Sequence, residues 1–166
     1  MDIKQILIFG LFLVPVCTSK RSPCYEEHRL REEAEKKLKS HYPQPPDPST
    51  NSTRDSPVSC PVESFYQKPS EDANERSLSP WRYVRVIQTD RFPSEYSEAQ
   101  CLCSGCILIQ DKKPPMEIHD YDSKLIKQSR VFLKKELCED GKKYYLKPVS
   151  EEVGVGCTCT RASTSS

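Results

Sequence analysis

The sequence is poor in the residues that carry acid–base and nucleophilic chemistry, and poor in material for a large hydrophobic core. It has three histidines and one tryptophan among 166 residues, and only 36% of its residues are hydrophobic. It contains neither a Gly-x-Ser-x-Gly nor a His-Glu-x-x-His motif, so neither an α/β-hydrolase nor a zinc protease is indicated. The net charge of +1 leaves no basic excess to neutralise phosphates, so we expect no nucleic acid partner. Together these absences argue against an enzyme.

Long apolar runs are also scarce. The run from Ile6 to Val16 has eleven residues, whereas a helix that spans a bilayer needs about 20. It follows a short segment that carries Lys4 and precedes small residues ending at Ser19, which is the order of a secretory signal peptide. We therefore expect residues 1–19 to be a cleaved signal peptide, the mature protein to be secreted, and no membrane insertion after cleavage.

Cysteine, in contrast, is abundant. The chain has nine, and removal of Cys17 with the signal peptide leaves eight. An even number of cysteines in a short exported chain indicates a disulfide framework, although eight cysteines allow 105 pairings. The Cys103-Ser-Gly-Cys106 spacing also occurs in redox dithiols, but no helix N-terminus or βαβ pattern accompanies it here. We expect neither a metal site nor a cofactor.

The N-terminal third is predicted to lie outside the folded unit. Residues 20–59 combine a charged segment, Tyr25 to Lys39, with a proline- and serine-rich stretch from Pro43 to Ser59. The first has glutamate–lysine pairs four residues apart and a narrow apolar stripe, which predicts a marginal, weakly docked helix. The second offers little to bury and predicts a flexible linker, in which Asn51 begins an N-glycosylation sequence.

Residues 60–161 are predicted to form a mostly β domain, and residues 162–166 a disordered tail. Residues 124–137 fit a helix or a strand equally well on periodicity alone. Glu139 to Lys142 is typical of a hairpin turn. Strands are expected over 81–89, 102–110, 143–149 and 153–160.

The most informative pattern joins Cys101-Leu-Cys103-Ser-Gly105-Cys106 with Cys157-Thr-Cys159. Side chains two residues apart on a strand share a face, so Cys157 and Cys159 point toward the same neighbour. If Cys101 and Cys106 lie on that neighbour, two nearly parallel disulfides can form. Gly105 would then permit the close backbone approach that such packing needs.

Four segments carry a family resemblance. They are Ser77–Tyr83, Asp90–Ser94, Glu98–Ile107 and Val155–Cys159. In combination they resemble the interleukin-17 family of cytokines across the predicted domain, and the Cys101-Leu-Cys103 and Ser-Pro-Trp-Arg-Tyr forms are more similar to its C-type branch than to its A and F branch. The resemblance implies a small disulfide-rich, cystine-knot-like β-sheet fold that lacks the third knot disulfide, with a long strand over 124–137.

The resemblance also implies a cysteine pairing. It implies two knot bridges, Cys101–Cys157 and Cys106–Cys159, with Ser79 and Ser123 at the position of the missing third knot disulfide. It also implies Cys60–Cys138, expected between two subunits, although a bridge within one subunit stays open. Cys24 and Cys103 are left over, and we expect them to pair by elimination. The family acts as dimers that bind interleukin-17 receptor ectodomains, so we expect a homodimer, or a heterodimer with a relative, that triggers inflammatory and epithelial defence signalling.

Five residues near the expected Asp90–Pro93 turn are candidates for receptor contact. Trp81 fits a buried core anchor better than a receptor contact, because an indole buries a large area. The other four are better candidates because they flank the turn-like Asp90–Pro93 segment: Arg82, Arg91, Phe92 and Tyr96. A secreted inhibitor or toxin-like scaffold would share the cysteine density but should fold as a monomer.

Overall fold

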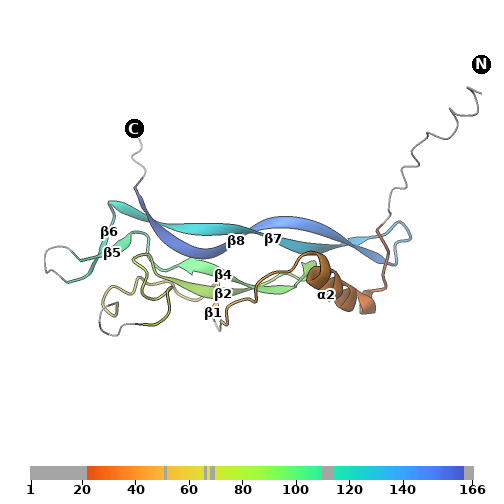
Figure 1. Cartoon of the computed structure of the whole chain (residues 1–166), viewed down its shortest axis with the longest axis horizontal. Helices are drawn as coiled ribbons and strands as arrows, with labels where there is room; N and C mark the ends of the chain where they lie inside the picture. The colour runs from red at the N-terminus through yellow and green to blue at the C-terminus, as the bar shows by residue number, and fades with distance from the viewer. Residues whose placement is uncertain (1–21, 51, 66, 68–69, 110–113, 163–166) are drawn as a thin grey trace, which may run out of the picture.

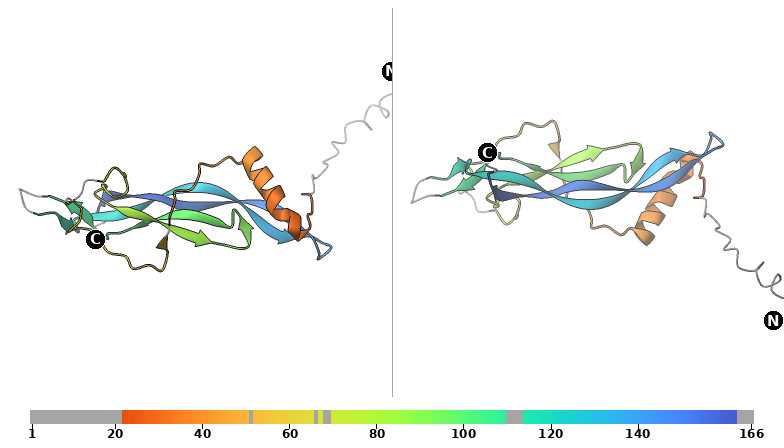
Figure 2. Two further views of the ribbon diagram at one scale, coloured as in Figure 1. Left: turned by 90° about the horizontal axis from the view of Figure 1, so that it is seen from below. Right: turned by 90° about the horizontal axis from the view of Figure 1, so that it is seen from above.

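A long antiparallel ribbon of two strands forms the axis of the molecule. The computed structural model describes residues 22–50, 52–65, 67, 70–109 and 114–162. Strand β7 (Tyr121–Leu137) pairs with β8 (Tyr144–Arg161) over the whole length of both. Figure 2 shows the two strands twisting around each other along the molecule, with α2 at one end and β5 and β6 at the other. The long strand over 124–137 and the cystine-knot-like β class are confirmed.

A tight turn closes this ribbon at the helix end. Gly141 has φ of 65°, a left-handed conformation that glycine adopts without a steric cost. The Asp140 carboxylate accepts hydrogen bonds from the backbone N–H groups of Lys142 and Lys143, both at 2.9 Å. The predicted turn is therefore correct, but the two strands expected after it form the single strand β8.

A second, shorter sheet lies against the ribbon (Figure 1). Strand β2 (Trp81–Ile87) pairs antiparallel with β4 (Glu95–Cys101), and β1 (Ser52–Thr53) adds to β2 in parallel. Strand β3 (Arg91–Phe92) joins the edge of β7, and β5 (Cys106–Leu108) pairs with β6 (Met116–Ile118). The buried side chains Val86, Tyr96, Phe132 and Val153 pack together between the two sheets.

The charged N-terminal segment is a docked element rather than a marginal helix. It forms a short 3-10 turn, η1 (Glu27–Arg29), followed by α2 (Leu30–His41). Leu30 and Ala34 are 1% and 0% exposed and pack against Leu133 and Leu146 of the ribbon. The narrow apolar stripe is sufficient because it meets a matching apolar patch at the far end of β7 and β8.

The expected linker is also part of the fold. Residues 43–50 run as an extended segment beside the ribbon, and Ser52–Thr53 forms β1. Because polar side chains hold this segment, it needs no apolar residues of its own. The fold thus includes residues well before Cys60. The predicted signal peptide, Asn51 and residues 163–166 lie outside the described residues.

Candidate functional site

Two disulfides hold the end of the molecule opposite α2. Cys101 bonds to Cys157 and Cys106 to Cys159, the two knot bridges that the resemblance implies. Cys157 and Cys159 lie on β8 opposite Leu125 and Ser123 of β7. The bridges therefore tie the end of β4 and the start of β5 to one face of the ribbon.

Two serines occupy the position expected for a third knot bridge. The hydroxyl oxygens of Ser79 and Ser123 lie 2.6 Å apart and share a hydrogen bond. Ser79 is 1% exposed, so its hydroxyl depends on this partner, because an unpaired buried hydroxyl costs about 1–3 kcal/mol. A hydrogen bond thus joins the two serines that the resemblance implies at the position of the missing third knot disulfide.

The other two predicted bridges are wrong. Cys24 bonds to Cys138, and Cys60 bonds to Cys103. Tyr25 exchanges two backbone hydrogen bonds with Tyr144, at 2.7 and 2.9 Å, which brings Cys24 beside the turn that follows β7. Cys103 lies at the knot end, so neither Cys60–Cys138 nor Cys24–Cys103 could form within one subunit without crossing the length of the ribbon. The predicted intersubunit bridge loses both of its cysteines to partners within the chain.

The loop between the knot cysteines is fixed by one carboxylate. Glu117 Oε1 accepts hydrogen bonds from Ser104 N at 2.8 Å, Ser104 Oγ at 3.0 Å and Gly105 N at 2.7 Å. Burial alone would raise the pKa of Glu117, but these hydrogen bonds outweigh it and lower the pKa below its usual range. A Cβ at Gly105 would lie 2.6 Å from the Ile118 carbonyl oxygen, so the predicted close backbone approach is present.

The same loop does not offer a metal or redox centre. The Cys60 and Cys103 sulfurs and the Glu117 carboxylate lie within 4.8 Å of one another. Both sulfurs are joined in a disulfide, however, and metal binding needs thiolates. Cys103 and Cys106 have different disulfide partners, which removes the dithiol that their spacing suggested. Within the described residues, no helix is long and apolar enough to cross a bilayer.

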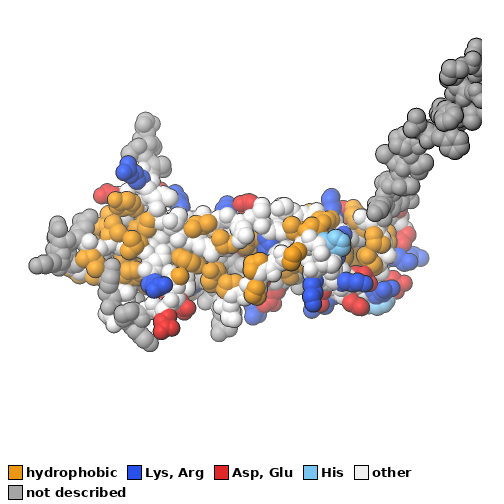
Figure 3. Space-filling view, viewed as in Figure 1, with side chains coloured by type: hydrophobic (Ala, Val, Ile, Leu, Met, Phe, Trp, Pro, Cys, Tyr) orange, Lys and Arg blue, Asp and Glu red, His pale blue; other side chains and the backbone are white. Residues whose placement is uncertain are grey.

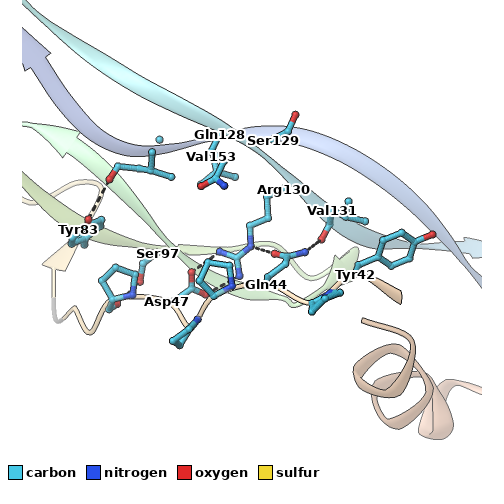
Figure 4. A pocket seen from close by; sticks show the side chains of 16 residues that line it. Tyr42, Gln44, Asp47, Tyr83, Ser97, Gln128, Ser129, Arg130, Val131 and Val153 are labelled. Atoms are coloured by element: carbon cyan, nitrogen blue, oxygen red, sulfur yellow. Dashed lines mark hydrogen bonds and ion pairs between the residues drawn. The ribbon is translucent and has the colours of Figure 1, made fainter. Parts of the chain in front are cut away.

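A groove of about 420 Å³ lies between the extended segment and the ribbon (Figure 4). We call residues 42–50 the arm. The floor of the groove comes from the middle of β7 and β8, one wall from Tyr83 and Ser97, and the other wall from the arm itself, which includes Tyr42 and four prolines. Asp47 and Arg130 are the charged residues among those that line it.

Side chains rather than backbone pairing hold the arm in place. Gln44 donates to the Val131 carbonyl at 2.6 Å and accepts from the Arg130 guanidinium. Arg130 also binds both carboxylate oxygens of Asp47. Ser97 donates to the Pro48 carbonyl at 2.8 Å. Proline has no N–H to pair with a strand, so these contacts replace the ladder that the arm cannot form.

Arg130 is fixed from below as well as above. Its guanidinium carbon lies 5.7 Å from the Tyr96 ring centre and 5.6 Å from that of Phe132, within the range of a cation–π contact. Its side chain is 17% exposed. The groove therefore contains one rigidly held cation over an aromatic base.

A bulge shapes the wall of the groove nearest the knot. Ile126 pairs with Gly156 and Lys127 with Gly154, which leaves Val155 without an opposite residue. The Tyr83 hydroxyl donates to the Val155 carbonyl at 3.2 Å. Ile126 and Val155 remain 45% and 38% exposed, so apolar surface continues from the groove onto the ribbon. Bulges often redirect side chains beside binding sites.

Three of the five predicted contact residues serve internal packing. Tyr96 is 7% exposed in the core between the sheets, and burial raises its pKa. Phe92 packs against the cluster beneath α2. The Arg91 side chain is 11% exposed and pairs with Asp90 and Glu151. These three residues therefore have little area left for a partner.

The remaining two residues lie beside the arm and the knot. Arg82 donates to the carbonyls of Ser56 and Pro57 and to Gln100 at 2.9 Å, so it anchors the chain that follows the arm. Trp81 packs over Gly156, where an added Cβ would lie 3.3 Å from the ring. Its indole N–H is buried without a hydrogen-bond partner among the described residues. The structure brings none of the five predicted residues into the groove.

The residues that do form the groove carried no local signal. Asp47 and Arg130 are 83 positions apart, and Gln44 and Val131 are 87 apart. Each is unremarkable in its own segment, and only the fold of the arm onto the ribbon brings them together.

Comparison with known proteins assigns this arrangement to a family. Residues 77–161, just over half of the 166, match the family model described as Interleukin-17. Interleukin-17C from Homo sapiens is 34% identical over 107 residues, covering 60% of this chain and 53% of the relative. Interleukin-17C from Mus musculus is 34% identical over 107 residues, which covers 60% of this chain and 54% of the relative.

The similarity extends to other branches. Interleukin-17F from Rattus norvegicus is 39% identical over 88 residues, covering 53% of this chain and 51% of the relative. The chain thus spans about half the length of the curated relatives it matches. The predicted C-type resemblance is confirmed, and the chain belongs to the interleukin-17 family.

Proposed function

We propose that the chain is a secreted cytokine that binds receptor ectodomains of the interleukin-17 type and performs no catalysis. Family membership supports the cytokine role. The observation that carries the receptor contact is the groove beside the arm, which combines tyrosines, prolines and one held arginine. Tyrosine and arginine are over-represented among the residues that dominate binding energy.

Secretion is supported by the chemistry of the fold. Four disulfides connect the segments before α2 and after the arm with the turn of the ribbon and the knot. Such bridges form and persist in oxidising compartments and are rare in the cytosol. The two hydrophobic clusters are small, so these bridges add to the stability of the domain.

Signalling would require two receptor chains to be brought together. Two copies of the chain in an isologous dimer would present two grooves, one on each subunit, and bivalence would raise the effective affinity. All eight cysteines of the described chain pair within the subunit, so we propose that the dimer is non-covalent.

A monomeric inhibitor scaffold is the second candidate. The pairing of all eight cysteines of the described chain within one subunit favours it. A chain that uses every cysteine internally needs no partner to complete its disulfides. An inhibitor would bind a receptor or a protease without activating a cell, and one assay separates the two functions.

That assay is a reporter-cell experiment. Cells carrying interleukin-17-type receptors, and the same cells lacking them, receive the secreted protein or a reduced and alkylated sample of it. We expect activation only by the folded protein and only with the receptors. Binding to those cells without activation would favour the inhibitor, and no binding to any receptor of this type would contradict the proposed function.

A further inference from the structure

The arm forms one wall of the groove and does not fill it. Its four prolines, Pro43, Pro45, Pro46 and Pro48, are exposed and line this space of about 420 Å³. The polar contacts of Gln44, Asp47 and the Pro48 carbonyl bridge this space. An element that bridges a hollow on a few polar contacts loses little apolar burial when it moves.

The arm is fixed at both ends, and between them it is held by side-chain contacts. The Cys24–Cys138 bridge and α2 fix the chain before it, and the Cys60–Cys103 bridge fixes the chain after it. Movement of the arm would therefore widen or narrow the groove while the arm stays attached to its own subunit.

One ion pair fastens the middle of the arm. The Arg130 guanidinium lies over the rings of Tyr96 and Phe132. On its other side it binds both carboxylate oxygens of Asp47 in a bidentate ion pair. Arginine recognises carboxylates in this paired manner, which gives direction as well as affinity. If Asp47 leaves, the fixed guanidinium faces a groove whose other lining residues carry no charge, and another carboxylate could take the place of Asp47.

We infer that the groove receives a receptor loop in which an apolar side chain is followed by an acidic residue, and that this carboxylate replaces Asp47 on Arg130 as the arm moves outward. The apolar side chain would lie against Tyr83, Val131 and Val153. Asp47 acts as an internal competitor for the site. This inference rests on the proposed function and specifies the chemistry of the same site.

The two halves of the ion pair give opposite predictions. Asp47→Asn removes the competitor and should tighten binding to an interleukin-17-type receptor ectodomain about fivefold, because less of the protein is in the closed form. Arg130→Gln removes the group that the receptor binds and should weaken binding about tenfold. Asp55→Asn makes the same change in the exposed chain beyond the arm and should leave affinity unchanged.

The measurement is the equilibrium affinity of each secreted variant for a panel of such ectodomains, with circular dichroism and disulfide mapping to confirm folding. A purely structural ion pair would make both substitutions weaken binding together. Equal effects of the two variants, or no effect of either, would overturn the inference while leaving receptor binding itself intact.

A second probe tests the groove without any receptor. N-acetyl-Trp-Asp-amide, titrated to millimolar concentration, should shift the NMR amide signals of Val131, Val153 and Val155. N-acetyl-Trp-Asn-amide, which lacks the charge, should shift them less, and Arg130→Gln should remove the difference. Equal shifts with both peptides would contradict the carboxylate site even if the receptor binds. Peptide binding without ectodomain binding would instead count against the proposed function alone.

Discussion

At the scale of single residues, polar groups complete a knot that has too few disulfides. Ser79 and Ser123 hydrogen-bond at the third position of the knot, and Glu117 holds the loop between Cys103 and Cys106. Each contact satisfies one buried group, the Ser79 hydroxyl or the Gly105 N–H, so its removal leaves that group without this hydrogen bond. Two predictions follow from these contacts.

Glu117→Gln should lower stability and flatten its dependence on acid pH. Because the pKa of Glu117 is lowered in the fold, its contribution is fully present above the usual glutamate value of about 4.3. That contribution is lost as the pH falls through the lower, folded value. We expect a loss of about 1 kcal/mol at neutral pH, shrinking toward zero in acid, measured by urea unfolding at several pH values. A constant difference across that range would contradict this role.

Ser79→Cys combined with Ser123→Cys should convert the hydrogen bond into a fifth disulfide. The two positions are 44 residues apart, so closing the loop could add roughly 4 kcal/mol on the chain-entropy model. Intact mass should show the loss of two hydrogen atoms relative to the reduced double variant, and thermal unfolding should move upward. Ser79→Cys alone serves as the control. Two free thiols at these positions in a folded protein would contradict the knot geometry.

Some residue roles were readable from spacing and others were not. Cys157 and Cys159 share a face because strands alternate, and Gly105 was identified from its place beside Cys106. The roles of Arg130 and Asp47 depend on a contact across 83 positions. No local pattern encodes such a contact.

At the scale of elements, the N-terminal segments complete the fold. Helix α2 covers the apolar end of the ribbon, and the arm connects it to β1 along the groove. Without them, Leu133 and Leu146 would be exposed and the groove would lose one wall.

Leu30→Ala should therefore destabilise the whole domain by about 3 kcal/mol, because a fully buried leucine is lost from a small cluster. Lys36→Ala, on the exposed side of the same helix, should cost less than about 0.5 kcal/mol. Denaturant unfolding with the disulfides intact measures both. Equal small effects would show that α2 contributes no packing.

A strand could be predicted where the periodicity of the sequence agrees with the burial of the side chains in the fold. Trp81–Ile87 alternates as a half-buried strand, and its strand was expected. Strand β4 was missed, because Glu95–Cys101 has few β-formers and its side chains Tyr96 and Ala99 are buried only through tertiary packing. The arm was taken for a linker because its anchors are side chains on other elements.

At the scale of the whole molecule, disulfides stabilise both ends of the ribbon. Two bridges form the knot, one ties Cys24, before α2, to the turn of the ribbon, and one ties the chain after the arm to the knot loop. Hydrophobic side chains gather at the end that carries β5 and β6, as the space-filling view shows (Figure 3). The cysteine count predicted a framework, but the partners of Cys24 and Cys60 depend on where the N-terminal segments dock.

Electrophoresis without reductant should accordingly give a single-chain band, although light scattering under native conditions should give the mass of two chains. The reason is that every cysteine of the described chain has a partner in its own subunit. Peptide mapping should recover Cys24–Cys138 and Cys60–Cys103. A dimer band that disappears on reduction would restore the intersubunit bridge.

The most direct test of the central claim is the equilibrium binding of the secreted, disulfide-intact protein to immobilised interleukin-17-type receptor ectodomains. The account predicts saturable binding to at least one of them, lost when Cys101–Cys157 and Cys106–Cys159 are reduced and alkylated, and weakened by Arg130→Gln. Absence of binding to every ectodomain by a correctly folded and correctly bridged protein would contradict the assignment as a receptor-binding cytokine.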